Sequence, residues 1–351
     1  MLFSEIAEVL NAKPVQQHSN PSIEWLLTDS RKLVLPETTL FFTINSAKRN
    51  AHVFVKELYD KNLRNFVVQN IEEIDMVSLP EANILLVPDA LDALQMIASH
   101  HRSKFNYPVI GITGSNGKTM VKEWLYQLLS DQYKIIRSPR SYNSQTGVPL
   151  SVWQMDDEYN LGIFEAGIST INEMSKLQSI IKPGIGLITF IGDAHAEGFE
   201  NINQKIKEKL SLFTEANCLI YCKDDALLHD QVQQFIKDHN PSLECFSWSL
   251  KNNADLRILT TERGQNGTLV TAEWNKENFK FFIPFTDKAS LHNAISCCCV
   301  LLKLNINSSA IFEKMRHLRQ VEMRLELKEG IQHCSIINDS YSADINSLSI
   351  A

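Results

Sequence analysis

The residues of this chain best suited to chemistry form a glycine-rich loop. The segment Gly111–Thr119 has the spacing G-x-x-G-x-x-G-K-T and follows an apolar run that begins at Val109. In such a loop the backbone N–H groups surround phosphate oxygens, and the next helix adds the positive end of its dipole. Lys118 could reach terminal phosphate oxygens, and the Thr119 hydroxyl could bind Mg²⁺. The strict P-loop pattern would place a glycine at Ile112, so this spacing is a variant of that motif.

The segments on either side of the loop complete a strand–loop–helix unit. Apolar side chains recur after Thr119 at the i, i+3, i+4, i+7, i+8 spacing of one buried helical face. A glycine-rich structural turn is the alternative, and the complete context argues against it. We therefore expect a nucleotide-phosphate loop. Its members would be Gly114, Ser115, Asn116, Gly117, Lys118 and Thr119.

A carboxylate and an imidazole follow two further predicted strands. Glu165 comes directly after the apolar run Leu161–Phe164, and His195 follows the run Gly186–Phe190. Because ligands of parallel sheets bind at the C-terminal strand ends, both side chains are expected near the loop. Glu165 is a hard oxygen ligand of the kind that Mg²⁺ prefers. A lone histidine at a strand end is more often structural, and only its partnership with Glu165 and the loop favours a functional role for His195.

The elements that must position these groups indicate an α/β protein of several domains. Residues 1–103 read as a small α/β domain, with strands at Thr39–Phe42, Asn65–Val68 and Ile84–Val87 and helices at His52–Leu63 and Ala90–Arg102. Residues 104–310 alternate strand and helix, which predicts right-handed βαβ units and a mainly parallel, P-loop-type sheet with helices on both faces. Residues 311–351 supply one helix and two strands, too few to close a core, so we expect an incomplete α/β domain.

Two local patterns allow a structural as well as a functional reading. Lys205, Lys207 and Lys209 lie in the predicted helix Ile202–Phe213, where a lysine-rich sequence normally indicates a solvated face. Periodicity selects none of the three for function. The polar cluster Thr28–Arg31 is by itself most simply an ordinary turn.

Composition narrows the classes of protein that this chain can belong to. At 351 residues the length predicts two or three domains. The net charge of −7 argues against bulk nucleic-acid binding. We see no signal peptide and no apolar run near the ~20 residues of a membrane span, so we expect a cytoplasmic protein. The seven cysteines lack metal-type spacing and are expected to be reduced and mostly buried.

Further motifs accompany the loop along the chain. They are Asp29-Ser30-Arg31, Tyr142–Leu150, Glu165-Ala166-Gly167, Ala194–Phe199, Lys209, His292-Asn293, Arg324 and Asp339–Ala343. In these motifs, and in their order from about residue 28 to the end of the chain, the sequence resembles the Mur ligase family, ATP-dependent enzymes that form amide bonds in cell-wall assembly. Within the family, the chain looks most like the members that join D-alanyl-D-alanine to UDP-N-acetylmuramoyl-tripeptide.

This resemblance implies a domain plan and a reaction. Residues 1–103 would bind the UDP-sugar, residues 104–310 would bind Mg-ATP, and residues 311–351 would begin the C-terminal ligase domain. The tripeptide carboxylate would attack the γ-phosphate of ATP, and the dipeptide amine would then attack the acyl phosphate. Because the first step brings two anions together, cations must neutralise them. The chain is expected to act as a monomer, without nucleic acid.

The resemblance also implies a role for each matching residue. Lys118, His195 and Lys209 would be catalytic, with one Mg²⁺ on Thr119 and Glu165. A second Mg²⁺ would lie at His195 and at Lys209, which would be carbamylated. Of the remaining residues, Asn293 would contact the adenine, Asp339 the ribose, Arg324 the phosphates, Ser30 and Arg31 the uridine diphosphate, and Asn143 and Thr146 the muramoyl part.

Three other interpretations remain open from the sequence. The first is an amide ligase with another acceptor, such as the ligase that adds the third peptide residue or a folate polyglutamate or cyanophycin-type synthetase. Residues 1–103 count against a folate enzyme, which has no separate UDP-sugar domain. The second is a P-loop kinase or GTPase, in which we would not expect Glu165 and His195 on successive strands or the long sequence of a third domain. The third is a binding-competent but inactive fragment, since an incomplete third domain should strongly reduce ligase activity.

Overall fold

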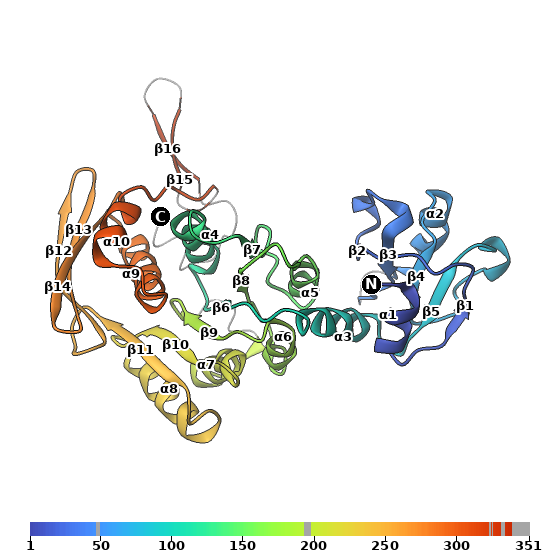
Figure 1. Cartoon of the computed structure of the whole chain (residues 1–351), viewed down its shortest axis with the longest axis horizontal. Helices are drawn as coiled ribbons and strands as arrows, with labels where there is room; N and C mark the ends of the chain where they lie inside the picture. Colours follow the sequence, from blue (N-terminus) through green and yellow to red (C-terminus); the bar gives the residue numbers. More distant parts are fainter. Residues whose placement is uncertain (47–49, 193–197, 323, 325, 331–333, 339–351) are drawn as a thin grey trace. The chain divides into compact units, whose positions relative to one another are not determined.

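The computed structural model describes residues 1–46, 50–192, 198–322, 324, 326–330 and 334–338. The chain divides into two compact units (Figure 1). Unit 1 comprises Met1–Asn106 and Ser144–Met155, and unit 2 comprises Tyr107–Asn143 and Asp156–Ala351. The first junction falls between Asn106 and Tyr107.

Unit 1 is built on a five-stranded sheet of order β1-β5-β4-β3-β2. Strands β2 to β5 are parallel, and β1 pairs antiparallel with β5. The strands are β1 (Pro14–Gln16), β2 (Trp25–Leu27), β3 (Thr39–Phe42), β4 (Asn65–Val68) and β5 (Asn83–Leu86). The α-helices are α1 (Phe3–Val9), α2 (Val55–Asp60), α3 (Ala90–Arg102) and α5 (Gly147–Val152), with short 3₁₀ helices η1 (Ser30–Lys32), η2 (Pro36–Thr38), η3 (His52–Phe54) and η4 (Met76–Ser78).

The sheet of unit 1 is covered on both faces. Successive residues of a strand point to opposite faces, so Leu40 and Phe42 join the core under α1 and α3 while Phe41 joins the core under α2. A strand buried on both sides carries a continuous apolar run, as β3 and β4 do. The C-terminal side of α5 also belongs here, because Trp153 is buried in the core under α3 and donates to the Glu24 carbonyl at 2.8 Å.

Unit 2 is built on a nine-stranded sheet of order β14-β13-β12-β11-β10-β9-β6-β8-β7. The seven strands β6 to β12 are parallel, and β13 and β14 extend the sheet as antiparallel hairpin partners. The strands are β6 (Val109–Thr113), β7 (Ile135–Arg137), β8 (Leu161–Glu165), β9 (Ile185–Ile188), β10 (Cys218–Cys222), β11 (Glu244–Ser249), β12 (Leu256–Gly264), β13 (Gly267–Trp274) and β14 (Glu277–Ile283).

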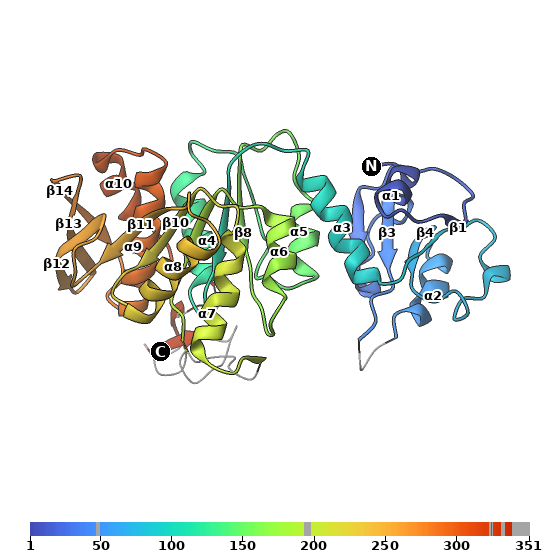
Figure 2. The same cartoon turned by 90° about the horizontal axis from the view of Figure 1, so that it is seen from below.

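Helices cover both faces of this sheet. In Figure 1, α4, α9 and α10 lie on one face and α6, α7 and α8 on the other; in Figure 2, α7 and α8 lie in front of the sheet. A separate two-stranded ladder follows, formed by β15 and β16. The elements are α4 (Lys118–Leu129), α6 (Met174–Ile181), α7 (Ile202–Leu210), η6 (Ser211–Phe213), α8 (Ala226–Asp238), α9 (Lys288–Lys303), α10 (Ser308–Met315), β15 (Glu326–Glu329) and β16 (Ser335–Asn338).

The predicted fold class is confirmed, and several elements have the predicted bounds. Strands β3 and β4 and helix α3 match residue for residue, and Asp89 caps α3 by accepting from the N–H groups of Leu91 and Asp92. Strands β12 and β13 form a hairpin in which Gly264 lies opposite Gly267. All seven cysteines are free thiols, and Cys218 and Cys297–Cys299 are buried, as predicted.

Other features were not predicted. The helix predicted at His52–Leu63 is shorter, because its first turn is 3₁₀ and α2 ends at Asp60. The segment 144–155 belongs to unit 1, and α10 packs with unit 2, whose core includes Ile311 and Met315. The functional domain division at residues 103 and 310 stays a prediction.

Candidate functional site

The glycine-rich loop connects β6 to α4 in a conformation that requires glycine twice. Gly114 has φ 144° and Gly117 has φ 90°, both in the left-handed region that other residues rarely adopt. A Cβ on Gly114 would lie 2.0 Å from the Thr189 hydroxyl oxygen, and one on Gly117 would lie 2.5 Å from Asn293 Oδ1. The motif glycines therefore let the loop pass closely against residues that follow β9 and begin α9.

The end of β9 holds the loop in place. The Phe190 carbonyl accepts from the N–H groups of Ser115 at 2.8 Å and Asn116 at 3.4 Å. The Thr189 hydroxyl donates to the Asn116 carbonyl at 2.6 Å. Two of the loop amides that were expected to bind phosphate thus contact the protein itself in this structure.

Lys118 begins α4 and turns back over the loop. Its Nζ donates to the carbonyls of Gly114 at 2.9 Å and Ser115 at 3.0 Å. Burial lowers the pKa of Lys118, the attraction of Glu165 raises it, and the positive charges of Arg324 and Lys205 lower it further. The ammonium group has only backbone carbonyls as hydrogen-bond partners among the contacts that the structure describes, so an anion at the loop would be a better partner.

Thr119 and Glu165 meet because β6 and β8 are parallel neighbours. Ile112 pairs with Glu165, so the last residue of β8 lies beside the start of the loop. The Thr119 hydroxyl donates to Glu165 Oε2 at 3.1 Å and lies 3.0 Å from the Ser141 hydroxyl. Asn143 Nδ2 reaches the same carboxylate oxygen at 3.4 Å. The structure therefore brings together the two predicted Mg²⁺ ligands, Thr119 and Glu165.

The Glu165 carboxylate is fully buried and retains an unused acceptor. Its Oε1 lies 3.0 Å from Lys122 Nζ but accepts no hydrogen bond. A hydroxyl and a carboxylate with spare lone pairs fit the hard oxygen set of Mg²⁺. Among the described residues no three His, Cys, Asp or Glu side chains form a metal cluster. One hydroxyl and one carboxylate, from Thr119 and Glu165, still suit Mg²⁺, because this ion commonly keeps several waters and takes only one or two protein carboxylates plus phosphate oxygens.

Lys122 belongs to this cluster and was missed by the sequence analysis. It lies one helical turn after Lys118, is fully buried, and donates to the carbonyls of Ser138 and Arg140. The sequence feature that could have indicated its role is the position of this lysine within the buried apolar stripe of α4, between Val121 and Trp124. A lysine is almost never fully buried unless it is paired, so its partner was the missing information.

Helix α7 directs two of its three lysines at the loop. Lys209 Nζ donates to the Gly114 carbonyl at 3.1 Å, and Lys205 Nζ donates to the Gly192 carbonyl at 2.6 Å. Both side chains are 3% exposed, whereas Lys207 faces solvent. The expectation of a solvated face is therefore wrong for Lys205 and Lys209. Burial lowers the pKa of Lys209 well below its ordinary value, and the nearby charges of Lys118 and Lys205 add to the effect.

Asn293 and Arg324 also reach the loop. Asn293 is buried on α9 against Gly117, and its Nδ2 donates to Met120 Sδ at 3.3 Å. Arg324 Nη2 lies 3.4 Å from the Thr119 hydroxyl and 3.4 Å from the Ser141 hydroxyl. The predicted members Lys118, Thr119, Glu165, Lys209, Asn293 and Arg324 thus gather around one loop.

Other predicted site residues lie elsewhere. Ser30 begins η1 in unit 1 and is buried, whereas the Arg31 guanidinium is exposed and pairs with Asp29 at 2.8 Å. Thr146 precedes α5 in unit 1, while Asn143 belongs to unit 2 beside Glu165. Two predicted residues, His195 and Asp339, fall outside the described residues.

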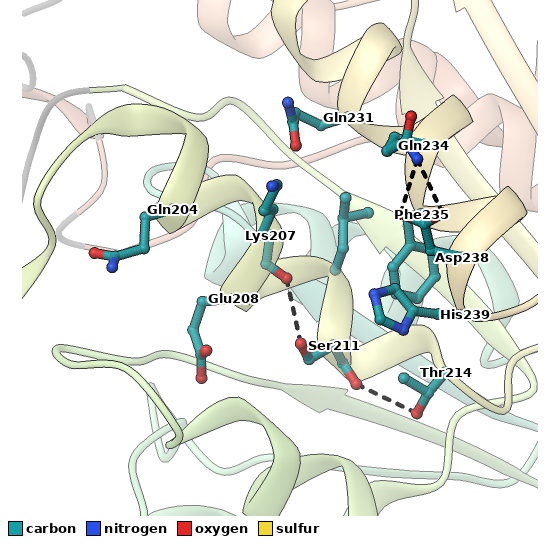
Figure 3. Close-up of a pocket in the computed structure, with 11 residues that line it drawn as sticks. Gln204, Lys207, Glu208, Ser211, Thr214, Gln231, Gln234, Phe235, Asp238 and His239 are labelled. Atoms are coloured by element: carbon teal, nitrogen blue, oxygen red, sulfur yellow. Dashed lines mark hydrogen bonds between the residues drawn. The ribbon is translucent and has the colours of Figure 1, made fainter.

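A separate cavity of about 230 Å³ lies between α7 and α8 (Figure 3). It opens on the face of α7 that carries Gln204, Lys207, Glu208 and Ser211, whereas Lys205 and Lys209 face the loop. Among the described residues its lining contains none of the strand-end groups. We therefore place the candidate site at the loop and not at this cavity. The lining is Gln204, Lys207, Glu208, Leu210, Ser211, Thr214, Gln231, Gln234, Phe235, Asp238 and His239.

Comparisons with known proteins identify a family model and curated relatives similar to this chain. The Mur ligase middle domain matches residues 112–301. A curated relative, the UDP-N-acetylmuramoyl-tripeptide–D-alanyl-D-alanine ligase of Bacillus subtilis, is 27% identical over 339 residues, covering 95% of this chain and 70% of the relative.

Two solved structures share the fold. MurF from Acinetobacter baumannii superposes with a TM-score of 0.86 at 20% identity, over 99% of this chain and 74% of that one. The MurF ligase from Thermotoga maritima in complex with ADP gives a TM-score of 0.77 at 20% identity, over 93% of this chain and 73% of that one. The architecture of this chain is thus one that holds an adenine nucleotide in another protein.

Proposed function

The chain belongs to the Mur ligase family, and we propose that it joins D-alanyl-D-alanine to UDP-N-acetylmuramoyl-tripeptide with consumption of ATP. The observation that carries this proposal is the cluster of Lys118, Thr119 and Glu165 at the loop, in a chain similar along its length to ligases of that name. The reaction supplies amide bonds for peptidoglycan precursors.

The first chemical step places two anions in contact, the tripeptide carboxylate and the γ-phosphate of ATP. Lys118 would leave its two loop carbonyls and donate to the phosphate oxygens, because a charged acceptor makes the stronger hydrogen bond. Arg324 would add positive charge from the other side of Thr119. Bond formation gives an acyl phosphate and ADP, and attack by the dipeptide amine then releases phosphate and forms the amide.

The nucleotide would lie along the loop. Gly114, Ser115, Asn116 and Gly117 would pass close to its phosphates, since side chains at the glycines would fill the space. Asn293, buried against Gly117, would hold the adenine edge. Asp339 would hold the ribose.

Thr119 and Glu165 would hold Mg²⁺, which would draw charge from the phosphates and orient them for in-line transfer. Lys209 would become carbamylated and form a second Mg²⁺ site with His195. The pKa of Lys209 favours this, because its lowered value leaves more of the unprotonated amine that reacts with CO₂. A lysine with a free ammonium would repel a metal cation.

The substrate residues belong to two parts of the chain. Ser30 and Arg31 in unit 1 would bind the uridine diphosphate, for which the exposed Arg31 guanidinium is a suitable partner. Asn143 and Thr146 would bind near the muramoyl part. The monomeric state and the cytoplasmic location stay predictions; no helix of the described chain has the length and apolar character needed to cross a membrane.

A thermal-shift titration tests the proposal. We expect UDP-N-acetylmuramoyl-tripeptide to raise Tm more than UDP alone, and an ATP analogue with Mg²⁺ to raise it independently. A ligand at ~100 times its Kd adds about 2.7 kcal/mol of stability, which is readily measured. Stabilisation by the ATP analogue alone would contradict the substrate assignment. Stronger stabilisation by the UDP-muramoyl-dipeptide than by the tripeptide would favour the ligase that adds the third peptide residue.

A further inference from the structure

We propose that Lys122 is a positioning residue that orients the Glu165 carboxylate toward Thr119 and so determines how tightly the loop binds Mg²⁺ with a nucleotide. This inference rests on the proposed function only in needing a Mg-nucleotide at the loop. It does not depend on which acceptor or donor the enzyme uses. The described contacts of the Lys122 side chain include none with the loop backbone, and Lys122 is not among the residues proposed above to bind the nucleotide or Mg²⁺. We therefore infer that it acts through Glu165.

The position of Lys122 is held by several bonds. Its side chain is fully buried, and its Nζ donates to the Ser138 carbonyl at 2.7 Å and to the Arg140 carbonyl. Both carbonyls belong to the segment that follows β7. Since α4 fixes the other end of the side chain, the ammonium group has little freedom to move.

The two carboxylate oxygens of Glu165 have different neighbours. Oε1 lies 3.0 Å from Lys122 Nζ, and Oε2 accepts from the Thr119 hydroxyl at 3.1 Å. A carboxylate can rotate about its last bond, and the cation on one side limits that rotation by Coulomb attraction. Lys122 therefore keeps Oε2 beside the Thr119 hydroxyl, the pair of oxygens that fits Mg²⁺.

A series of charged side chains also fixes the Lys122 ammonium group. Lys122 Nζ is also 3.0 Å from Glu123 Oε1, and Glu123 Oε2 accepts from Arg137 Nε at 3.1 Å. The Arg137 guanidinium stacks over the Tyr126 ring at 3.5 Å. Residues behind a metal ligand commonly orient it in this way, and changing them typically costs 10–100-fold in metal affinity.

A purely structural role makes a different prediction. Lys122 links α4 to the segment after β7, and loss of that link alone would lower stability without changing how Mg²⁺ affects nucleotide binding. Lys314 provides a matched control, because this lysine of α10 likewise links its own helix to the C-terminal end of α4. Its Nζ donates to the Leu128 carbonyl at 2.9 Å and pairs with Asp131, away from Glu165.

The test is calorimetric titration of the whole chain with ADP, with Mg²⁺ varied and with EDTA as the metal-free arm. For Lys122→Met we expect unchanged ADP affinity in EDTA and a roughly 10–100-fold higher Mg²⁺ concentration for half of the magnesium effect. Lys314→Met should match the wild type in both arms. A magnesium effect in Lys122→Met equal to that of the wild type would overturn the proposal.

Two further variants cover the case in which Lys122→Met folds poorly because it leaves Glu165 buried without its contact cation. Lys122→Gln keeps an amide donor for the backbone carbonyls, and it should show the same roughly 10–100-fold shift in Mg²⁺ dependence while staying folded. In Glu165→Gln the magnesium effect should already be weakened at least as much as in Lys122→Met, and adding Lys122→Met to Glu165→Gln should weaken it no further. An additional loss in the double variant would show that Lys122 acts by another route and would overturn the proposal.

The titration also separates this inference from the proposed function. If magnesium-dependent ADP binding is lost in the variants but the tripeptide fails to stabilise the wild type, the positioning role stands and the substrate assignment fails. If the wild type binds ADP with no magnesium effect, the role of Lys122 is refuted whatever the tripeptide does.

Discussion

A buried polar network in unit 1 differs from the buried charges around the loop of unit 2. In unit 1 the buried side chains of Asn65, Asn83 and His52 hydrogen-bond to other side chains and to the backbone. Asn83 donates to Asn65 Oδ1 at 2.8 Å and to the Ser19 hydroxyl at 3.0 Å, while its own oxygen accepts from the His18 and Ser19 amides. Asn65 in turn donates to the Thr39 carbonyl at 3.1 Å. These asparagines join neighbouring strands and the segment before β2.

A buried histidine in unit 1 follows the same rule. His52 Nε2 accepts from the backbone N–H groups of Gln69 and Asn70, each at 3.2 Å. Its Nδ1 lies 3.0 Å from Asn50 Oδ1. Because Nε2 must be an acceptor for both amides, the ring is neutral with its proton on Nδ1.

Unit 2 instead gathers buried charge that its own groups satisfy only in part. Lys118 and Lys209 donate to backbone carbonyls around the loop, and Glu165 keeps an oxygen without a hydrogen bond. Burying a charge with an incomplete set of partners costs free energy that a ligand can recover. The satisfied network of Asn65, Asn83 and His52 therefore contributes to the stability of unit 1, whereas the loop cluster of unit 2 retains capacity for the phosphate and Mg²⁺ that we propose it binds.

The largest effect is expected at the loop. Lys118→Met should weaken binding of an ATP analogue by roughly 100-fold, or about 2.7 kcal/mol, because it removes a charged donor to the phosphates. The melting temperature should change little, since the lysine donates only to loop carbonyls. Calorimetry measures the affinity, and Lys207→Met on the exposed side of α7 is the control. A large loss of stability with unchanged affinity would contradict the conclusion that the buried lysine of the loop serves ligand binding rather than stability.

A comparable change in unit 1 should act on stability instead. Asn83→Ala leaves the Asn65 oxygen and two backbone amides without partners, which should cost roughly 2–3 kcal/mol. Hydrogen exchange of peptides that cover β4 and β5 reports on this unit directly. Asn20→Ala, at an exposed position, is the control. Nucleotide affinity should stay at the wild-type value, and a decrease would mean that this network also supports the loop.

A surface residue of unit 1 sharpens the comparison from the other side. The Arg31 side chain is 79% exposed and bonds Asp29 through two nitrogens. Arg31→Ala should therefore leave the unfolding transition unchanged and weaken UDP binding roughly tenfold. Calorimetry with UDP measures the expected loss of affinity, and a urea titration measures the stability that should stay unchanged. Equal UDP affinity in the variant would remove Arg31 from the proposed site.

The smallest effect is a pH dependence that comes from His52. Burial lowers the pKa of His52, partly opposed by the Glu73 carboxylate. The unfolded chain therefore takes up this proton at a higher pH than the folded chain, and stability is lost as the pH falls through the ordinary histidine value near ~6.5. Urea titrations between pH 7.5 and 5.5 should show the stability difference between wild type and His52→Gln shrinking toward acid. A constant difference would contradict the neutral assignment.

Much of the site was predictable because its signals are local. The loop spacing, the lysine and threonine that begin α4, and the carboxylate that ends β8 all lie within single strand–loop or loop–helix segments. The identities of Asn293 and Arg324 followed only from family resemblance, since neither has a local signal. Lys122 was missed because a buried lysine is recognisable only with its partner, and Glu165 is 43 residues further along the chain.

The sequence by itself determined the alternation of strands and helices and the glycine-rich loop between β6 and α4, because these depend on residues a few positions apart. Tertiary structure alone decided which lysines of α7 are buried. Lys205 and Lys209 face the loop and Lys207 faces solvent because α7 packs with one side against the sheet. It also assigned residues 144–155 to unit 1. Burial and partner choice depend on contacts between distant segments, and no local pattern records them.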